Sequence, residues 1–198
     1  MLGIVEFLHQ EQDQTIVHVE ETELSGVMML RPRVHEDARG YFMETYNETE
    51  FVRATGVRER FVQDNQSRSC KGVLRGLHYQ VGNNAQGKLV RVVAGRIFDV
   101  AVDLRRSSAT FGGWAGRYLD AHRHAQLWIP AGFAHGFLVL SDLADVAYKT
   151  TAPYDPDAER SVHFADPEIA IGWPTGVTPT LSARDAAAGP FSEAELFP

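Results

Sequence analysis

The sequence predicts an all-β sandwich or barrel with a few short peripheral helices. Short apolar runs recur about every 8 to 12 residues between turns that contain glycine or proline, a spacing typical of sandwiches and barrels. Residues 96–104 alternate, with apolar side chains on one predicted face and Asp99 and Asp103 on the other. The length of 198 residues and the 44% hydrophobic content fit one soluble domain spanning residues 1–198.

Strands are expected wherever apolar and polar residues alternate, or where a short apolar run lies between turn residues. A polar stretch at residues 35–40 is expected to be a loop. The predicted strands cover residues 27–31, 41–46, 60–67, 72–80, 89–94, 96–104, 114–119, 127–130, 136–140 and 144–150.

Two short helices are expected beside these strands. Asn47 lies three residues before Glu50, which resembles a capping box, and Gly56 fits a helix end, so residues 48–55 are predicted to be helical. Near the C-terminus, Ser182 and Asp185 have the spacing of a second helix start.

Charge and composition exclude several classes of protein. The net charge of −7 argues against a general nucleic-acid-binding protein. Cys70 is the one cysteine, which excludes an internal disulfide and a multi-cysteine zinc site. The start of the chain lacks a basic n-region and a long apolar run, so we expect no membrane association and a cytoplasmic location. Residues 1–16 are rich in amides and acids after the first eight, so we expect an N-terminal arm or an added edge strand.

The stretch at residues 72–88 concentrates polar groups that a strand and its following loop can direct into a cavity. Regular alternation would place Arg75 and His78 on opposite faces of the strand. Gly76 lies between them, and a glycine inside a strand often marks a bulge. A bulge at Gly76 would let Arg75 and His78 share one face, with Lys88 following in the next strand.

Two motifs in the sequence have the wrong context for the functions that they suggest. Residues 82–88 match G-x-x-x-x-G-K, but Leu89 and a strand follow where a phosphate-binding loop needs Ser or Thr and a helix. His122 and His124 suggest a metal site, but they lie in a polar turn. We therefore expect surface histidines there and no metal site.

Several polar groups on neighbouring predicted strands indicate a pocket. His78 and His135 both stand beside glycines in apolar strands, and either alone is more typical of a core histidine. Together with Arg75, Lys88 and Tyr148 they favour a ligand site. From the residues alone, the prediction is an acidic β-barrel whose pocket contains His, Lys, Arg and Tyr.

The chain contains, in this order, the blocks DARGYFMETY, FVQDNQS, GVLRGLHYQ, QGKLVRVVAGRIFDVAVDLRRSSATFG, LWIPAGFAHGF, YKTTAPYDP, DPEIAIGWP and LSARD. Together these blocks resemble the dTDP-4-dehydrorhamnose 3,5-epimerase family, whose members are metal-independent epimerases of sugar nucleotides. The resemblance implies a cupin-type jelly-roll barrel without metal or organic cofactor. It also implies a homodimer in which an N-terminal strand of each subunit joins the partner's sheet.

The resemblance also implies roles for individual residues. The catalytic base is His78, with Asp185 as its dyad partner, and the proton donor is Tyr148. Lys88 matches a lysine beside the C4 oxygen of the sugar, where it would stabilise an enolate. The implied substrate-binding residues are Arg39, Glu44, Gln63, Asp64, Asn65, Arg75, Lys88, His135, Tyr154, Glu159 and Arg184.

The implied substrate is a dTDP-linked 4-keto-6-deoxy hexose, inverted at C3 and C5 to give dTDP-4-dehydro-L-rhamnose. Three alternatives remain open from the sequence. The first is a relative that inverts only C3 or only C5, and the second is a cupin that binds a sugar nucleotide without catalysis. The third is a metal-dependent cupin oxygenase.

Overall fold

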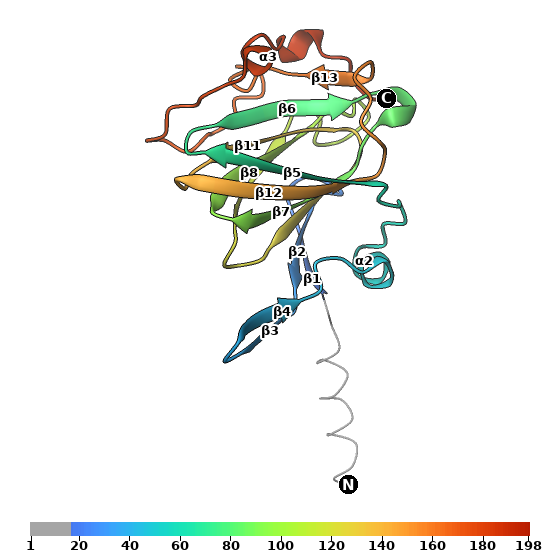
Figure 1. The fold of residues 1–198 in the computed structure, drawn as a ribbon. Helices are drawn as coiled ribbons and strands as arrows, with labels where there is room; N and C mark the ends of the chain where they lie inside the picture. Colours follow the sequence, from blue (N-terminus) through green and yellow to red (C-terminus); the bar gives the residue numbers. More distant parts are fainter. Residues whose placement is uncertain (1–16) are drawn as a thin grey trace.

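In the computed structural model, which describes residues 17–198, two antiparallel sheets face each other across an apolar core (Figure 1). The all-β prediction is confirmed. The larger sheet, in spatial order, contains β1 (Val17–Glu21), β2 (Met28–Pro32), β10 (Gln126–Ile129), β7 (Lys88–Ala94), β12 (Leu143–Thr150) and β5 (Gln63–Cys70). The smaller contains β13 (Glu159–Ser161), β6 (Leu74–Gln80), β11 (Phe133–Val139), β8 (Arg96–Asp103) and β9 (Trp114–Asp120).

A separate two-stranded hairpin projects away from the barrel, formed by β3 (Val34–Asp37) and β4 (Gly40–Met43) (Figure 1). The expected loop at 35–40 is therefore wrong, and the strand expected at 41–46 begins and ends earlier. Residues 34–37 have no apolar alternation because most of them are exposed, so the pattern gave no strand signal there.

Other boundaries also differ from those expected. Strands β1 and β13 were not predicted, and β5 begins at Gln63, three residues later than expected. The predicted N-terminal arm at residues 1–16 lies outside the described residues.

The core lies between the inner faces of the two sheets. Val90 and Val146 of the larger sheet and Ile97 and Phe137 of the smaller one belong to this buried cluster. Burying one such side chain stabilises the fold by about 1.5–3 kcal/mol. This contact between the sheets fixes the walls of the barrel.

Helix α2 (Glu48–Thr55) covers part of the outer face of the larger sheet. Its prediction is confirmed, since the side-chain oxygen of Asn47 accepts a hydrogen bond from the Glu50 amide at 3.3 Å. Gly56 ends the helix in the left-handed conformation, with φ of 73°. The helix packs through Phe51, whose ring centroid lies 5.5 Å from that of Trp128.

Strand β8 carries the predicted alternation, but its polar face points into the barrel. Phe98 and Val100 pack on the outside against residues of the C-terminal segment, including Trp173. Asp99 and Asp103 point inward and are completely buried. A sandwich normally has apolar residues on its inner faces, so the two aspartates need polar partners inside the protein.

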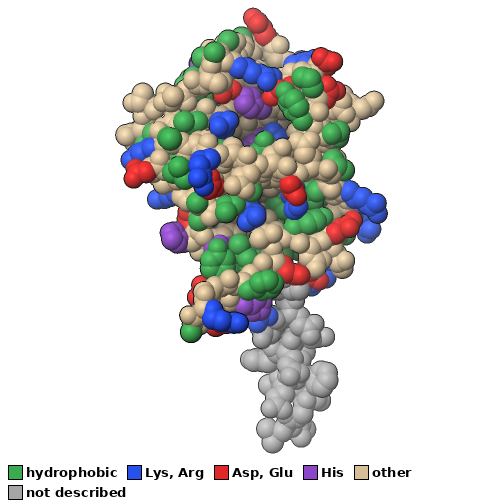
Figure 2. Space-filling view, viewed as in Figure 1, with side chains coloured by type: hydrophobic (Ala, Val, Ile, Leu, Met, Phe, Trp, Pro, Cys, Tyr) green, Lys and Arg blue, Asp and Glu red, His purple; other side chains and the backbone are tan. Residues whose placement is uncertain are grey.

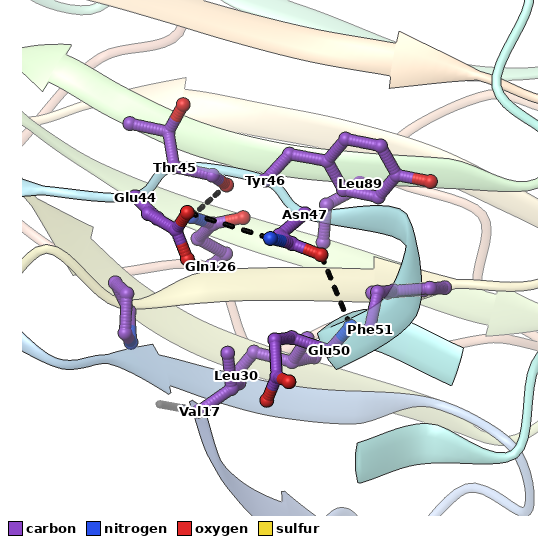
Figure 3. Close-up of a pocket in the computed structure, with 11 residues that line it drawn as sticks. Val17, Leu30, Glu44, Thr45, Tyr46, Asn47, Glu50, Phe51, Leu89 and Gln126 are labelled. Carbon is purple, nitrogen blue, oxygen red and sulfur yellow. Dashed lines mark hydrogen bonds between the residues drawn. The ribbon is translucent and has the colours of Figure 1, made fainter. Parts of the chain in front are cut away.

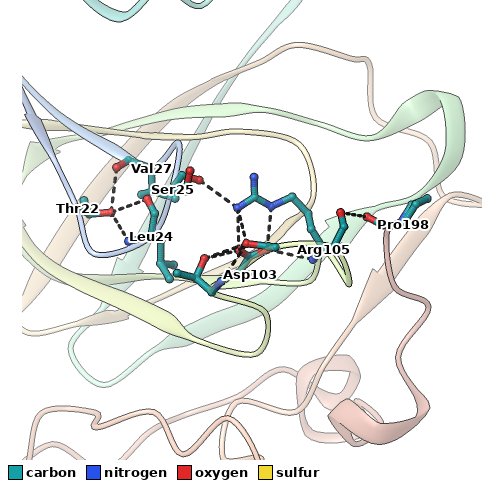
Figure 4. Close-up of polar contacts among 10 residues, drawn as sticks. Thr22, Leu24, Ser25, Val27, Asp103, Arg105 and Pro198 are labelled. Atoms are coloured by element: carbon teal, nitrogen blue, oxygen red, sulfur yellow. Dashed lines mark hydrogen bonds and ion pairs between the residues drawn. The ribbon is translucent and has the colours of Figure 1, made fainter.

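Asp103 finds these partners locally (Figure 4). Its carboxylate accepts hydrogen bonds from the Arg105 guanidinium at 2.8 and 2.7 Å and from the hydroxyls of Ser108 and Thr110. Arg105 also donates to the Ser25 carbonyl at 3.0 Å. Burial alone would raise the pKa of Asp103, but these hydrogen bonds lower it to about 2. We call these four side chains the closed centre: Asp103, Arg105, Ser108 and Thr110.

Candidate active site

A bulge in β6 sets the geometry of the site, and the expected bulge at Gly76 is confirmed. Opposite β11, Arg75 pairs with Phe137 and His78 with His135, so β6 spans the same distance with one extra residue. Gly76 has φ of 129°, and a Cβ there would lie 2.5 Å from the Cα of Gly136. Only glycine fits this crossing of the two strands.

The bulge lets Arg75 act on the same interior as His78. The Arg75 Nε donates to the Ser69 hydroxyl at 3.0 Å, on the inner face of β5. Arg75 also lies close enough to Tyr148 to affect its ionisation electrostatically.

His78 is paired with a carboxylate that follows it by 107 residues in the chain. Its Nε2 lies 2.5 Å from Oδ1 of Asp185. The short helix α3 (Ala183–Ala186) presents Asp185, and Ser182 caps that helix as expected while donating to Oδ2 of the same carboxylate at 2.9 Å. Reciprocal backbone hydrogen bonds at Thr180, with Gly72 and Leu74, hold this segment beside β6.

The imidazole has the character of a base. Burial lowers the pKa of His78, and the hydrogen bond to Asp185 opposes that shift without cancelling it. The ring is therefore largely neutral near pH 7. A carboxylate on one ring nitrogen fixes the tautomer and leaves the other nitrogen free to accept a proton.

Lys88 and Tyr148 reach the same interior from the larger sheet. Thr150 pairs with Lys88 across β12 and β7, and Tyr148 pairs with Val90, so Lys88 and Tyr148 lie diagonally on one face. Burial lowers the pKa of Lys88 to about 8, although Asp99 and Glu159 oppose the shift. Burial raises the pKa of Tyr148, so its phenol stays protonated.

The side chains of His78, Lys88 and Tyr148 line one cavity of about 130 Å³. Figure 2 shows histidine and cationic side chains around a hollow in the upper part of the barrel. The lining brings together seven of the residues expected from the sequence, which are Gln63, Asn65, His78, Lys88, Tyr148, Tyr154 and Glu159. Tyr79, Gln80 and Gln86 complete it.

A charged cluster lies beside the cavity. The Tyr154 hydroxyl donates to Oε2 of Glu159 at 2.6 Å, and the Arg184 guanidinium lies 2.7 Å from the same oxygen. The Gln63 side-chain oxygen accepts from the Tyr154 amide at 3.0 Å. Hydrogen bonds to Glu159 and Tyr154 raise the pKa of Arg184. An arginine and an exposed aromatic ring are suited to a phosphate and a planar base.

His135 lies directly opposite His78 in the β11–β6 pair. Its Nε2 lies 3.0 and 2.9 Å from the two carboxylate oxygens of Asp99. The barrel interior therefore holds two His–Asp pairs side by side.

Three expected residues lie away from this cavity. Arg39 is on the projecting hairpin, where it is paired with Asp37 and its side chain is 90% exposed. Glu44 lines a separate small cavity next to α2, where it accepts from the Asn47 amide group at 3.4 Å (Figure 3). Asp64 lies on the outer face of the larger sheet and pairs with Lys149 at 2.8 Å.

The structure also reveals interior polar residues that the sequence reasoning missed. The Ser67 hydroxyl is buried, and no residue of the described chain gives it a hydrogen-bond partner. Asp99 was placed only on a face of its strand. The sequence held no signal for Ser67, because every residue from 63 to 69 is polar and no alternation marks the inner face of β5.

Within residues 17–198, no group of three or more His, Cys, Asp or Glu side chains is placed to hold a metal ion. His122 and His124 lie in the turn after β9, and the His124 ring contacts Tyr41 with centroids 4.5 Å apart. None of the helices in the described part of the chain has the length and apolar character needed to span a membrane.

The fold and cavity define a jelly-roll enzyme of the cupin type, with a His–Asp pair, a lysine and a tyrosine inside the barrel. The family model for dTDP-4-dehydrorhamnose 3,5-epimerase matches residues 21–193. The chain belongs to this family of isomerases.

Individual relatives agree with this assignment. The chain is 54% identical over 175 residues to dTDP-4-dehydrorhamnose 3,5-epimerase of Pseudomonas aeruginosa, covering 88% of this chain and 96% of the relative. A crystal structure of dTDP-6-deoxy-D-glucose-3,5-epimerase from Legionella pneumophila, in complex with dTDP-4-keto-L-rhamnose, superposes with a TM-score of 0.87. Its sequence identity is 48%, with 90% of this chain and 95% of that one covered.

One relative carries out a single inversion. The dTDP-4-dehydrorhamnose 3-epimerase of Streptomyces niveus is 42% identical over 171 residues, covering 86% of this chain and 82% of the relative.

Proposed function

We propose that the protein inverts C3 and C5 of dTDP-4-dehydro-6-deoxy-D-glucose to give dTDP-4-dehydro-L-rhamnose, by proton transfer and without a metal or organic cofactor. The observation that carries this proposal is one cavity with three matched groups: a largely neutral imidazole, a protonated phenol and a buried ammonium. A 4-keto sugar needs these groups, because its carbonyl acidifies the protons on both neighbouring carbons.

Each inversion removes one C–H proton and returns one proton from the opposite face. His78 takes the proton on its free ring nitrogen, while Asp185 stabilises the imidazolium that forms. The electron pair moves onto O4, where Lys88 stabilises the enolate, an effect of about 3–4 kcal/mol for such a donor. Tyr148 delivers the new proton, and the enolate collapses to the ketone. His78 then releases its proton to solvent and Tyr148 regains one from solvent, so both groups are reset before the second inversion.

The charged cluster beside the cavity suits the nucleotide. Arg75 and Arg184 provide guanidinium forks for the diphosphate. Tyr154 is 52% exposed and can stack on the thymine base. In this proposal Gln63, Asn65 and Glu159 contact the nucleotide and His135 lines the sugar site.

Arg39, Glu44 and Asp64 lie away from this cavity, and we propose that a partner subunit explains the first two. The hairpin that carries Arg39 exposes large aromatic rings, with Tyr41 at 58% and Phe42 at 69%. Such rings suit a protein interface. We therefore propose a homodimer with shared N-terminal strands, in which residues 39–44 reach the partner's cavity.

Mixing two inactive variants tests this arrangement. Arg39→Ala and His78→Asn chains are unfolded together, refolded and assayed. If Arg39 serves the partner's site, random dimers restore about one site in four. No restored activity, or a monomer in light scattering, would contradict the shared site.

Solvent deuterium incorporation tests the reaction itself. The purified protein is incubated with dTDP-4-dehydro-6-deoxy-D-glucose in D2O, and the sugar is analysed by NMR. Deuterium at C3 and C5 with both centres inverted is the expected result. Label at one carbon would indicate the single inversion of the Streptomyces niveus relative. No label with nucleotide still bound would reduce the protein to a non-catalytic binder.

A further inference from the structure

The aspartate beside the second histidine has a placement that the proposed reaction does not yet explain. Asp99 is completely buried on the inner face of β8. Both of its oxygens lie within 3.0 Å of Nε2 of His135, and His135 is directly opposite the proposed base His78. Asp99 therefore contacts a residue that is itself the strand neighbour of the proposed base.

Other buried aspartates of the chain have different partners. Asp103 is held by Arg105, Ser108 and Thr110, which follow within seven residues. Asp145 pairs with Arg68 on the outer face of the larger sheet at 2.7 Å. Asp166 accepts from backbone amides, including that of Phe191. Among the described residues, the side-chain hydrogen bonds of Asp99 go only to His135, which pairs with His78 of the cavity.

Asp99 also acts on Lys88 through space. Lys88 is buried in the facing sheet, and Asp99 is the strongest influence that keeps its proton bound, followed by Glu159 of β13. The other titratable or charged groups around this interior include His78 and Arg75 of β6, His135 of β11, Tyr148 of β12 and Asp185 of α3. Of these neighbours, Asp99 and Glu159 are the carboxylates that favour the ammonium form of Lys88.

We propose that Asp99 is a positioning residue for the epimerisation, which orients the His135 imidazole toward the cavity and supplies the buried negative charge that Lys88 needs. This inference rests on the proposed function. When Nε2–H of His135 is donated to Asp99, Nδ1 is left as an acceptor for a sugar hydroxyl. When Lys88 keeps its proton, it can stabilise the enolate over a wider range of pH.

The variant Asp99→Asn tests the proposal, because it removes the charge and keeps the shape. The alkaline limb of the kcat/KM profile, where Lys88 loses its proton, should move to lower pH by about one unit. The rate deficit relative to wild type should therefore grow about tenfold between neutral and alkaline pH. The matched control Asp145→Asn removes another buried aspartate and should leave the limb in place.

A second pair of variants keeps the test decisive if Asp99→Asn does not fold. Removing one partner of a buried hydrogen bond leaves the other unsatisfied, which is more destabilising than replacing both. The double variant Asp99→Asn with His135→Asn is therefore compared with His135→Asn alone. The alkaline limb of the double variant should lie at a lower pH than that of His135→Asn. Equal limbs in the two proteins, or an unmoved limb in Asp99→Asn, would overturn the proposal.

Two measurements together separate this inference from the proposed function: deuterium incorporation by the wild type and the alkaline limb of the variants. If wild-type protein incorporates no deuterium at C3 or C5, the proposed function fails. If wild type incorporates deuterium at both carbons and the limb is unmoved in the variants, only the role of Asp99 fails.

Discussion

Two polar centres lie inside this barrel, and they are built in opposite ways. The closed centre around Asp103 takes its side-chain donors from the next seven residues, and its hydrogen bonds are short and mutual. The cavity centre takes His78 from β6, Lys88 from β7, Tyr148 from β12 and Asp185 from α3. The closed centre fills its space with protein, whereas the cavity centre leaves about 130 Å³ open.

The contrast teaches where stability and chemistry reside. A buried carboxylate with several local donors can be satisfied as soon as its loop forms, so it contributes to folding. Groups that come from distant parts of the chain meet only in the finished fold. Burial there lowers the pKa values of His78 and Lys88, which is typical of groups that take part in catalysis. Changes in the cavity centre should therefore lower the rate, and changes in the closed centre should lower stability.

The largest effect is expected from Tyr148→Phe, which removes the proton donor while keeping the ring. We expect kcat to fall by about 10²- to 10⁴-fold, the usual contribution of a general acid. Nucleotide affinity should change little, since the substitution removes one hydroxyl and keeps every group that is proposed to hold the nucleotide. Steady-state kinetics and calorimetry with dTDP separate the two quantities. Tyr118→Phe, on an exposed part of β9, is the control; a loss confined to affinity would contradict the assignment.

Asp103→Asn should disrupt the hydrogen bonds of the closed centre and lower stability without changing the rate of the reaction. Disrupting a buried ion pair costs about 3 kcal/mol or more of unfolding free energy, which denaturant titration will measure. The folded pKa of about 2 lies below the usual 3.8, so the wild-type contribution is present above pH 3.8 and lost as pH falls toward 2. The stability deficit of the variant should shrink over that range. A deficit that does not depend on pH would count against this account.

The smallest effect is the pH dependence of the wild-type rate. The rate should rise as His78 loses its proton at a pH below 6.5, because its pKa is lowered by burial. It should fall again as pH passes about 8 and Lys88 becomes neutral. Initial rates across this range give both limbs. A rate that continues to rise well above pH 8 would show that the Lys88 ammonium is not needed.

Local signals in the sequence predicted much of the fold. The cap at Asn47 and the stop at Gly56 defined α2, because both act within one turn of the helix. Gly76 predicted the bulge in β6, because a glycine destabilises the interior of a strand and often marks a bulge there. The strand at 34–37 was missed because most of its residues are exposed and no apolar periodicity marks it.

The candidate site was predictable only in part. His78 and Lys88 stand out as polar residues in apolar strands, and the resemblance to a family added Asp185, which no spacing connects to His78. Asp64 illustrates the limit, since it neighbours two cavity residues in sequence but points to the other face of β5. The role of Asp99 depends on contacts between two strands, and an alternating pattern does not show which face of a strand is the interior.

The most direct test compares deuterium incorporation by His78→Asn and Asp103→Asn at a temperature where circular dichroism shows both folded. The account predicts that His78→Asn loses incorporation at C3 and C5 by at least about 10²-fold while its melting temperature stays near that of wild type. Asp103→Asn should keep the wild-type rate and melt earlier. A His78→Asn protein that exchanges at the wild-type rate would contradict the central claim that this cavity carries out the proton transfer.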